Sequence, residues 1–475
     1  MVATRLHLFQ PYRMQKTAIM NERIRIHFVA IGGAAMHNLA IALHKKGYNV
    51  SGSDDEIFDP ASSNLAKCGL LPEAFGWFPE RITKELDAVI LGMHARKDNP
   101  ELIRAKELGL RIFSYPEFLY DQTQDKTRVV IGGSHGKTTV TSMILFVLKK
   151  MQVNFDYMVG AQVEGFDTMV GLSDQSRIAV FEGDEYLTSP IDLRPKFHVY
   201  RPHIAVVTGI AWDHINVFPT FENYVEQFKI FSNKIERDGK FIYFEEDANL
   251  IKIAENLRDD LTAIPYTVHP NHITEGKTWL ETKYGDIPLR VFGKHNLQNI
   301  QAAHLVCRQL GISDKDFYTS ISDFKGAAKR LQILNESDDC TIFQDFAHSP
   351  SKLKATVSAV KEQYPKRKLI ACMELHTFSS LTADFLPEYK DSMIDADEAY
   401  VYFNPKTIEH KHLATISPEQ VAEAFGGKNI EIFTDSNLLL KKLRSLTYKK
   451  KNLLMMSSGN FDGVNLKAFA LELLT

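Results

Sequence analysis

The stretch from Thr127 to Lys150 constrains the fold more than any other part of the chain, and it reads TRVVIGGSHGKTTVTSMILFVLKK. A short apolar run suited to a buried strand leads into glycines, and an apolar pattern with helical spacing follows them. That pattern places on one helix face Val140, Met143, Ile144, Val147 and Leu148. The order of strand, glycine-rich turn and helix predicts a loop whose backbone N–H groups and helix N-terminus bind phosphate.

The glycine spacing of this loop differs from the common phosphate loop G-x-x-x-x-G-K-[ST], which would need a glycine where Ile131 stands. The glycines are Gly132 and Gly133 instead. We still expect a working loop, in which Lys137 neutralises the β- and γ-phosphates of a nucleotide and the Thr138 hydroxyl is a ligand of Mg²⁺. The alternative is that GKTT only begins a helix.

Acidic residues follow two apolar runs downstream of this loop. RIAVFEGDEY places Glu182, Asp184 and Glu185 after one run, and HIAVVTGIAWDHINVF places Asp213 and His214 after another. Mg²⁺ prefers hard oxygen ligands, so these strand ends predict a metal site beside the phosphates. The alternative for each residue taken alone is a helix cap.

Apolar runs alternate with helix-period segments along the whole chain, which indicates an α/β protein with parallel sheets and crossover helices. A length of 475 residues exceeds one ordinary core and suggests about three domains. We expect a disordered lead-in at 1–22, with Met20 as a candidate start of translation. A Rossmann-like domain at 23–125, a P-loop ATPase-like domain at 126–327 and a Rossmann-like domain at 328–475 follow.

The first of these domains opens like a nucleotide-binding unit. IRIHFVAIGG predicts a strand, a helix is expected from Ala34 to Lys46, and YNVSGSD predicts the next strand. Asp54 lies 22 residues beyond Gly32, as in Rossmann-type fingerprints, although GGAAMH replaces G-x-G-x-x-G. A tight packing turn and an NAD-dependent dehydrogenase are the alternatives. A dehydrogenase would leave the second phosphate loop unexplained.

Composition excludes several classes of function. The net charge of −3 gives no attraction to nucleic acid or anionic membranes. The sequence has neither a membrane-length apolar run nor a signal-peptide pattern. The four cysteines are widely spaced without a C-x-x-C pair, which favours a reducing compartment over a zinc site. We expect a cytoplasmic protein with small-molecule substrates and no obligate protein partner.

The loop Gly133-Ser134-His135-Gly136-Lys137-Thr138-Thr139 resembles G-[T/S]-x-G-K-T-[T/S] of the Mur ligases, which is one residue shorter than the common version. These enzymes use ATP to attach amino acids or peptides to UDP-N-acetylmuramic acid. Further motifs of that family follow in order: FEGDE for E-x-D-E, DH at 213–214, FGKHNLQNIQAA at 292–303 for G-x-H-N-x-x-N-x-x-A-A, FKGAAKR at 324–330 for F-x-G-x-x-R-R and DFAHSP at 345–350 for D-Y-A-H-x-P. The chain is identified as a member of this family over nearly all of residues 24–475.

The resemblance implies ATP, two Mg²⁺ ions and an acyl-phosphate intermediate. The implied ATP-binding residues are Gly133, Ser134, His135, Gly136, Lys137, Thr138, Thr139, Asn296 and Asn299, with Arg330 and Asp345 reaching the nucleotide on domain closure. Thr138 and Glu182 would hold one Mg²⁺ and His214 the second. Catalysis would rest on Lys137, Glu182, His214, Arg330 and Asp345. For His135 and His348 a purely local packing contact is the alternative, and Lys229 is expected to be a surface lysine.

The resemblance also implies two substrate regions. The UDP part of the substrate would meet Gly32, Gly33, Ser53, Asp54, His94 and Asn99, and the amine substrate would meet His348, His376, Gly459 and Phe461. Three stretches favour the murein peptide ligase branch, which adds L-Ala-γ-D-Glu-meso-diaminopimelate: KFHVYRPHIAVVT, DFAHSPSKLKAT and MMSSGNFDGV.

The L-alanine ligase branch is the alternative. Those enzymes carry an arginine-bearing P-H-x-Y-T-R-T, whereas the corresponding LHTFSSL at 375–381 keeps His376 and lacks the arginine. Diaminopimelate and lysine both stay open as the third residue of the peptide. A non-catalytic ATP switch is a further alternative, which would leave the first and third domains unexplained.

Overall fold

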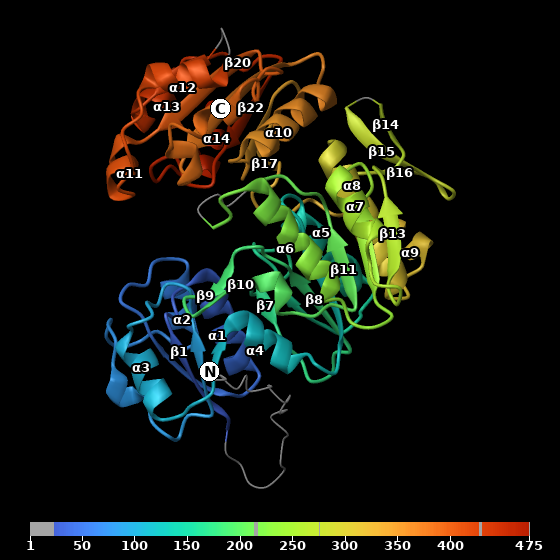
Figure 1. The fold of residues 1–475 in the computed structure, drawn as a ribbon. Helices are drawn as coiled ribbons and strands as arrows, with labels where there is room; N and C mark the ends of the chain where they lie inside the picture. The colour runs from blue at the N-terminus through green and yellow to red at the C-terminus, as the bar shows by residue number, and fades with distance from the viewer. Residues whose placement is uncertain (1–22, 213–216, 275, 427–429, 475) are drawn as a thin grey trace. The chain divides into compact units, whose positions relative to one another are not determined.

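The computed structural model describes residues 23–212, 217–274, 276–426 and 430–474, and it contains three separate parallel or mostly parallel sheets (Figure 1). This confirms the predicted α/β class with three domains. The predicted lead-in at 1–22 lies outside the described residues. By contact density the described chain forms two units, one up to Asp125 together with Thr188–Leu193, the other Lys126–Leu187 together with the chain from Arg194 onward.

The first domain has a four-stranded parallel sheet in the order β2-β1-β3-β4. Its strands are β1 (Arg25–Val29), β2 (Asn49–Ser53), β3 (Ala88–Leu91) and β4 (Ile112–Ser114), and its helices are α1 (Ala34–Lys45), α2 (Ala61–Lys67), α3 (Pro100–Glu107) and α4 (Tyr115–Gln122), with a 3₁₀ turn at Pro79–Arg81. Helix α1 begins where the sequence predicted and ends one residue earlier. Val29 pairs with Ser53, so the turns after β1 and β2 lie at one edge of the sheet.

The middle domain has a seven-stranded sheet in the order β13-β12-β11-β5-β8-β6-β7, parallel except for β6 with β7. The strands are β5 (Thr127–Gly132), β6 (Phe155–Met158), β7 (Val170–Gly171), β8 (Ile178–Glu182), β11 (Ile204–Val207), β12 (Lys240–Phe244) and β13 (Thr262–Tyr266). The helices are α5 (Lys137–Lys150), α6 (Phe221–Asn233), α7 (Ala248–Glu255), α8 (Lys294–Gln309) and α9 (Asp314–Ile321), with a 3₁₀ turn at Lys196–His198. Two small sheets are added, β9 (Leu187–Ser189) with β10 (Asp192–Pro195), and β14 (Asn271–Thr274), β15 (Lys277–Thr282) and β16 (Gly285–Pro288).

Side-chain alternation along the strands explains how both faces of this sheet are covered. Val129 and Ile131 of β5 face a core that includes the predicted apolar face of α5 and the inner face of α8. The opposite face carries an aromatic cluster, in which Phe197 stacks on Phe231 of α6 with ring centroids 4.6 Å apart. The helix predicted at 137–150 is therefore confirmed together with its buried face.

The C-terminal domain has a six-stranded sheet in the order β17-β18-β22-β19-β20-β21, in which only β17 is antiparallel to its neighbour. The elements are β17 (Gln332–Glu336), β18 (Thr341–Asp345), α10 (Pro350–Gln363), β19 (Lys368–Leu375), β20 (Glu398–Phe403), α11 (Pro405–His410), α12 (Pro418–Phe425), β21 (Ile430–Phe433), α13 (Ser436–Arg444), β22 (Lys451–Met456) and α14 (Leu466–Leu473), with 3₁₀ turns at Ser379–Leu381 and Leu386–Tyr389.

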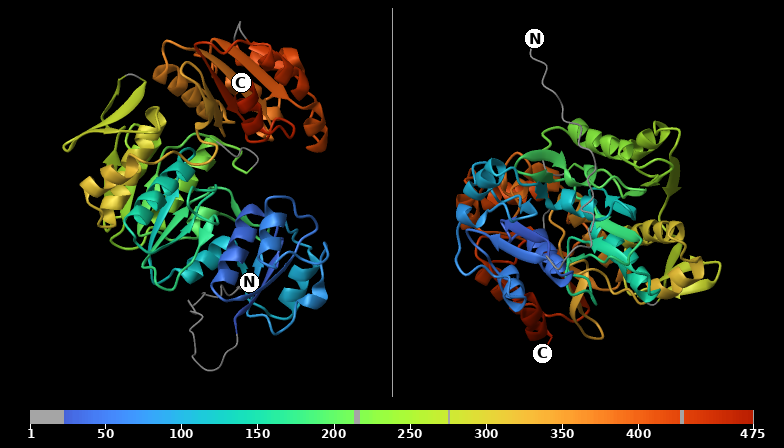
Figure 2. Two further views of the ribbon diagram at one scale, coloured as in Figure 1. Left: turned by 180° about the vertical axis from the view of Figure 1, so that it is seen from behind. Right: turned by 90° about the horizontal axis from the view of Figure 1, so that it is seen from below.

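Alternate residues of β19 enter two different cores, because helices cover both faces of the C-terminal sheet (Figure 2). Leu369, Ala371 and Met373 pack toward α10, α11 and α12, whereas Ile370 and Cys372 pack toward α13 and α14. No helix in the described part of the chain combines the length and the apolar character that a membrane span requires.

A buried ion pair lies at the start of the middle domain. The Lys126 ammonium donates to Asp156 Oδ2 at 2.5 Å, to the Ser173 carbonyl at 2.6 Å and to Ser176 Oγ at 2.7 Å. Both charged side chains are buried, at 6% and 1% exposed. A buried charge needs several such partners, so this cluster fastens the beginning of β5 to β6.

We expect Lys126→Ala to lower the free energy of unfolding of the middle domain by about 3–5 kcal/mol, because the Asp156 carboxylate stays buried without its partner. The matched control is Lys150→Ala, which removes an exposed pair with Asp323 and should cost less than about 1 kcal/mol. Urea denaturation followed by circular dichroism compares the two variants. Equal shifts of the two transitions would contradict the assignment.

Candidate ATP and substrate site

The geometry of the phosphate loop explains its glycines. The loop runs from the end of β5 at Gly132 to the start of α5 at Lys137. Gly133 has φ +123° and Gly136 has φ +79°, both disfavoured for L-residues. A Cβ on Gly133 would overlap Thr208 Oγ1, and one on Gly136 would overlap Asn299 Oδ1. Glycine is therefore required at these two positions, and none is needed where Ile131 lies in the strand.

Lys137 stands among acidic side chains at the start of α5. Its ammonium donates to the Gly133 carbonyl at 2.7 Å and to Glu185 Oε2 at 2.6 Å. Burial alone would lower the pKa of Lys137, but the nearby charges of Glu185, Asp184 and Glu182 hold that pKa above its ordinary value. Lys137 is thus a charged ammonium throughout the physiological range, as phosphate neutralisation requires.

The residues proposed for Mg²⁺ converge and suit this ion. Thr138 Oγ1 donates to Glu182 Oε1 at 2.9 Å, and the Gly160 N–H donates to Glu182 Oε2 at 2.7 Å. Burial raises the pKa of Glu182, against the charge of Lys137. Lys137 pairs with Glu185 and Lys196 pairs with Asp184, and the Glu182 carboxylate beside Thr138 is the hard oxygen ligand that Mg²⁺ prefers.

The described residues include only some of the predicted Mg²⁺ ligands. Among the described residues, no three His, Cys, Asp or Glu side chains converge closely enough to bind an ion by themselves. Asp213 and His214, the second predicted group, lie outside the described residues. Lys229 is an exposed residue of α6 beside Glu226, which confirms that it is a surface lysine.

Helix α8 borders the phosphate loop with its amide side chains. Asn299 lies against Gly136, and Asn296 is buried one turn earlier, where its Nδ2 donates to the Phe292 carbonyl at 2.8 Å. Gln298 donates to the Thr208 carbonyl at 2.7 Å and so ties α8 to the end of β11. The two asparagines of the predicted adenine site therefore lie on the helix that packs beside the loop.

Arg330 and Asp345 lie close together at the start of the C-terminal domain. The Asp345 carboxylate accepts from the N–H groups of Leu331 and Ala347, each at 2.7 Å. Arg330 stacks over the Phe346 ring, 4.6 Å from its centroid, and burial lowers its pKa against the charges of Asp345 and Glu182. Lys329 and Leu331 both have positive φ, so Arg330 sits in strained backbone of the kind that functional sites retain.

In the first domain the predicted UDP-binding residues gather at the edge after β1 and β2. The Gly32 N–H donates to Asp54 Oδ2 at 2.7 Å, and Ser53 is buried next to it. His94 is exposed beside Gly33. Asn99 caps α3 by accepting from two backbone N–H groups. The structure thus brings Gly32 and Asp54 together and places His94 beside Gly33, whereas the Asn99 carbonyl oxygen is already used to cap α3.

In the C-terminal domain the predicted amine-substrate residues lie at the ends of β19 and β22. The buried Glu374 carboxylate accepts from Ser457 Oγ and from the Phe461 N–H, the latter at 2.8 Å. His376 lies against Gly459, where a Cβ would come within 2.8 Å of its ring. The Phe461 ring is fully buried in the core and its N–H donates to Glu374, so Phe461 fixes the shape of this loop and its ring does not face substrate.

His348 makes a local contact, whereas His135 contacts α10 of the C-terminal domain. His348 Nδ1 bonds to the Phe346 carbonyl at 2.8 Å, and His135 Nε2 lies 2.7 Å from Ser351 Oγ.

Sequence reasoning missed Tyr224, Gln298 and Glu374. Of these only Glu374 left a signal, an acid inside the apolar run KLIACMEL.

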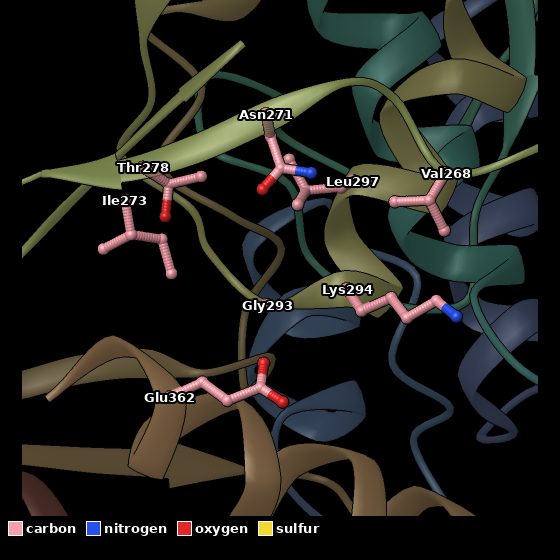
Figure 3. A pocket seen from close by; sticks show the side chains of 8 residues that line it. All are labelled: Val268, Asn271, Ile273, Thr278, Gly293, Lys294, Leu297 and Glu362. Atoms are coloured by element: carbon pink, nitrogen blue, oxygen red, sulfur yellow. The ribbon is translucent and has the colours of Figure 1, made fainter. Parts of the chain in front are cut away.

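A cavity of about 250 Å³ lies between the β14–β16 sheet, the first turn of α8 and the end of α10 (Figure 3). Its lining residues are Val268, Asn271, Ile273, Thr278, Gly293, Lys294, Leu297 and Glu362. At 100° per residue, the mean direction of Lys294 and Leu297 lies about 160° around α8 from that of Asn296 and Asn299. The cavity is therefore separate from the predicted nucleotide site.

Three models of known protein families match this chain, and each match corresponds to one of the three domains. Residues 25–127 match the Mur ligase family catalytic domain, residues 131–307 the Mur ligase middle domain and residues 329–459 the Mur ligase glutamate ligase domain. The UDP-N-acetylmuramate–L-alanine ligase of Limosilactobacillus reuteri is 31% identical over 80% of this chain and 85% of its own. The chain belongs to the Mur ligase family. Members of this family are ATP-dependent ligases that form C–N bonds, and this chain is such an enzyme of peptidoglycan synthesis.

Solved structures of the family share the fold over the whole chain. A UDP-N-acetylmuramate–alanine ligase from Thermotoga maritima has a TM-score of 0.70 at 19% identity, covering 95% of this chain and 98% of its own. A murein peptide ligase from Psychrobacter arcticus has a TM-score of 0.63 at 22% identity with the same coverage. Both branches of the family therefore have the fold of this Mur ligase.

We expect Gly136→Ala to weaken ATP binding at least about tenfold, because its Cβ would overlap Asn299 in backbone that disfavours L-residues. Gly311→Ala is the matched control, since Gly311 has φ +85° with open space around it. Isothermal titration with ATP and Mg²⁺ measures both. A similarly small change in the dissociation constant for ATP in both variants would show that strain at a positive-φ glycine, and not a specific role of Gly136 in the loop, causes the change.

Asp54 gives a pH-dependent prediction. Burial raises its pKa from the ordinary 3.8 to about 6, so the folded domain binds this proton more tightly than the unfolded chain does. The stabilisation is complete below pH 3.8 and is lost as pH rises through 6. Relative to wild type, Asp54→Asn should thus gain stability across this window. The full shift is worth about 3 kcal/mol, which solvent screening reduces to about 1–2 kcal/mol.

Thermal denaturation of wild type and Asp54→Asn at several pH values between 4 and 7 tests this. Titrating groups that do not interact with Asp54 are shared by the two proteins and cancel in the difference, whereas the neighbouring Asp55 contributes to it. A stability difference that does not change with pH would contradict a raised pKa for Asp54.

Proposed function

We propose that this Mur ligase joins the amine of L-Ala-γ-D-Glu-meso-diaminopimelate to the lactyl carboxylate of UDP-N-acetylmuramic acid, with ATP converted to ADP and phosphate. The product would be the UDP-linked tripeptide, and the reaction would reuse peptide released from the cell wall. The single observation that carries the choice of amine is the pair of loops after β19 and β22. They carry LHTFSSL without arginine and SSGNFDG pinned by Glu374.

In the first half of the reaction the carboxylate of UDP-N-acetylmuramic acid attacks the γ-phosphorus of ATP and ADP leaves. Lys137 would neutralise charge on the transferred phosphoryl group, and the N–H groups of the loop and of α5 would hold the other oxygens. Thr138 and Glu182 would hold Mg²⁺, which supplies further charge neutralisation when bound. Arg330, between residues with strained backbone, would add positive charge from the C-terminal domain.

In the second half the amine attacks the acyl phosphate carbonyl, the C–O bond to phosphate breaks and an amide remains. Acyl phosphates hydrolyse readily, so the site must exclude water at this stage. The region proposed for the amine is the edge of the C-terminal sheet where β18, β22 and β19 end. His376, Gly459 and the backbone at Phe461 lie at this edge, and His348 follows β18.

For the UDP part of the substrate we propose the edge of the first sheet. Gly32 and Gly33 offer backbone to the diphosphate without side-chain obstruction, as in other strand–glycine–helix turns. Asp54 would orient the Gly32 amide, and Ser53, His94 and Asn99 would complete the uridine and phosphate contacts.

Free L-alanine is the second candidate amine. A specific observation favours it, because bacterial relatives that are 27–31% identical to this chain bear the name UDP-N-acetylmuramate–L-alanine ligase. The missing arginine in residues 375–381 favours the tripeptide instead, since a free amino acid presents its carboxylate next to the reacting amine and needs a cation there.

Phosphate release from ATP with Mg²⁺ and UDP-N-acetylmuramic acid distinguishes the two amines. We expect kcat/KM at least about 100-fold higher with the tripeptide than with L-alanine, a discrimination of two or more contacts in the amine site. Lys137→Ala serves as the background control. Turnover with alanine alone would assign the enzyme to primary synthesis, and turnover with neither amine would remove the proposed substrates.

A further inference from the structure

Tyr224 of α6 contacts the phosphate loop through its hydroxyl, although no step above uses it. The side chain is fully buried. Its hydroxyl lies 2.9 Å from Ser134 Oγ in the loop and donates to Glu185 Oε1 at 3.1 Å. Glu185 in turn accepts from Lys137 through its other oxygen. Tyr224 thus contacts both a side chain of the phosphate loop and the carboxylate that pairs with Lys137.

The directions of the hydrogen bonds that link Ser134, Tyr224 and Glu185 follow from the chemistry of the outer groups. A carboxylate can only accept, so the single Tyr224 hydroxyl hydrogen points at Glu185. The Ser134 hydroxyl must then donate to Tyr224, while its oxygen accepts from the Ala211 N–H at 2.8 Å. The chain runs from Ala211 through Ser134 and Tyr224 to Glu185, where Lys137 donates from the other side.

The position of the Tyr224 hydroxyl is fixed by the core and not by the loop. The Tyr224 ring packs edge-on against Phe228 with centroids 5.2 Å apart, and Phe228 packs against Phe197 at 5.4 Å. Phe197 also stacks on Phe231 of the same helix. Because this aromatic cluster holds α6, the hydroxyl offers Glu185 a rigid donor.

We propose that Tyr224 is a positioning residue of the ATP reaction, which fixes Glu185 and thereby the place of the Lys137 ammonium in the phosphate loop. This assignment rests on the proposed function, in which Lys137 contacts the phosphates of ATP. With Glu185 held in place, Lys137 can turn from the carboxylate toward the transferred phosphoryl group. Without the hydroxyl, Glu185 loses a donor that opposes its movement with Lys137, so the ammonium stays longer in the resting ion pair.

Tyr224→Phe removes the hydroxyl and keeps the ring in the core. We expect kcat to fall about 10- to 100-fold, the usual effect of losing one hydrogen bond to a charged group. The matched control is Tyr157→Phe in the same domain, whose hydroxyl donates to the Thr168 carbonyl at 3.1 Å away from the loop. It should change kcat less than about twofold at a similar cost in melting temperature.

Steady-state ATP consumption with saturating UDP-N-acetylmuramic acid measures both variants, with whichever amine the wild type accepts. The choice of amine therefore does not affect the result. An unchanged kcat for Tyr224→Phe, or a rise in KM for ATP at constant kcat, would overturn the positioning role.

A double-mutant cycle separates positioning from a purely structural effect. If Tyr224 acts through Glu185, Tyr224→Phe should lower kcat less than about twofold further in a Glu185→Gln background. Independent structural effects would multiply instead and would overturn the assignment. If Tyr224→Phe has a much lower melting temperature than Tyr157→Phe, Ser134→Ala replaces it in the cycle. Ser134→Ala interrupts the same series of hydrogen bonds from the loop side. Its effect on kcat should likewise not add to that of Glu185→Gln.

The Lys137→Ala variant separates the proposed function of the phosphate loop from the proposed role of Tyr224. Normal turnover in that variant would overturn the proposed use of the phosphate loop as a whole. A strong loss in Lys137→Ala together with normal kcat in Tyr224→Phe would overturn only the role of Tyr224.

Discussion

The balance of charge around Lys137 is the constraint on which the ATP-binding edge depends. Buried charges are costly unless each has a partner at close range, so every group there is held by another. Lys137 is held by Glu185 and by the Gly133 carbonyl, and Glu182 by Thr138 and the Gly160 N–H. ATP phosphates would replace Glu185 as the partner of Lys137, and Mg²⁺ would balance the remaining acids. The resting pairs therefore keep the site ordered for a ligand of the same charges.

The three large sheets share one feature, which is that the proposed functional residues follow the carboxyl ends of their strands. Parallel strands end at a common edge, where turns and helix N-termini leave backbone N–H groups available. In the first domain this edge carries Gly32 and Asp54, in the middle domain the phosphate loop with Glu182, and in the C-terminal domain Asp345. The proposed sites would thus give a ligase of three substrates one sheet edge for each part of its chemistry.

Local patterns predicted most of the fold and several residues that lie together at the proposed ATP site. The strand, loop and helix at 127–150 depend on neighbours in sequence, so apolar spacing and glycine positions were sufficient. Tyr224 could not be predicted, because its contact with Ser134 joins residues 90 positions apart and leaves no pattern. For Phe461 the sequence indicated a substrate contact, whereas the ring lies in the core, since motif position does not reveal which way a side chain points.

The proposed choice of amine would depend on a different kind of constraint, which is backbone strain in the loop after β22. Phe461 and Asp462 both have positive φ, at 52° and 64°, which costs each residue about 1–3 kcal/mol. Such a loop persists only where the surroundings fix it, and here the buried Glu374 carboxylate accepts from the Phe461 N–H while Ser436 Oγ donates to the Phe461 carbonyl. Both anchors come from within the domain, so the loop keeps its shape without substrate. A preformed loop would select among amines by fit rather than by reordering, and its SSGNFDG sequence is part of what favours the tripeptide in the proposed function.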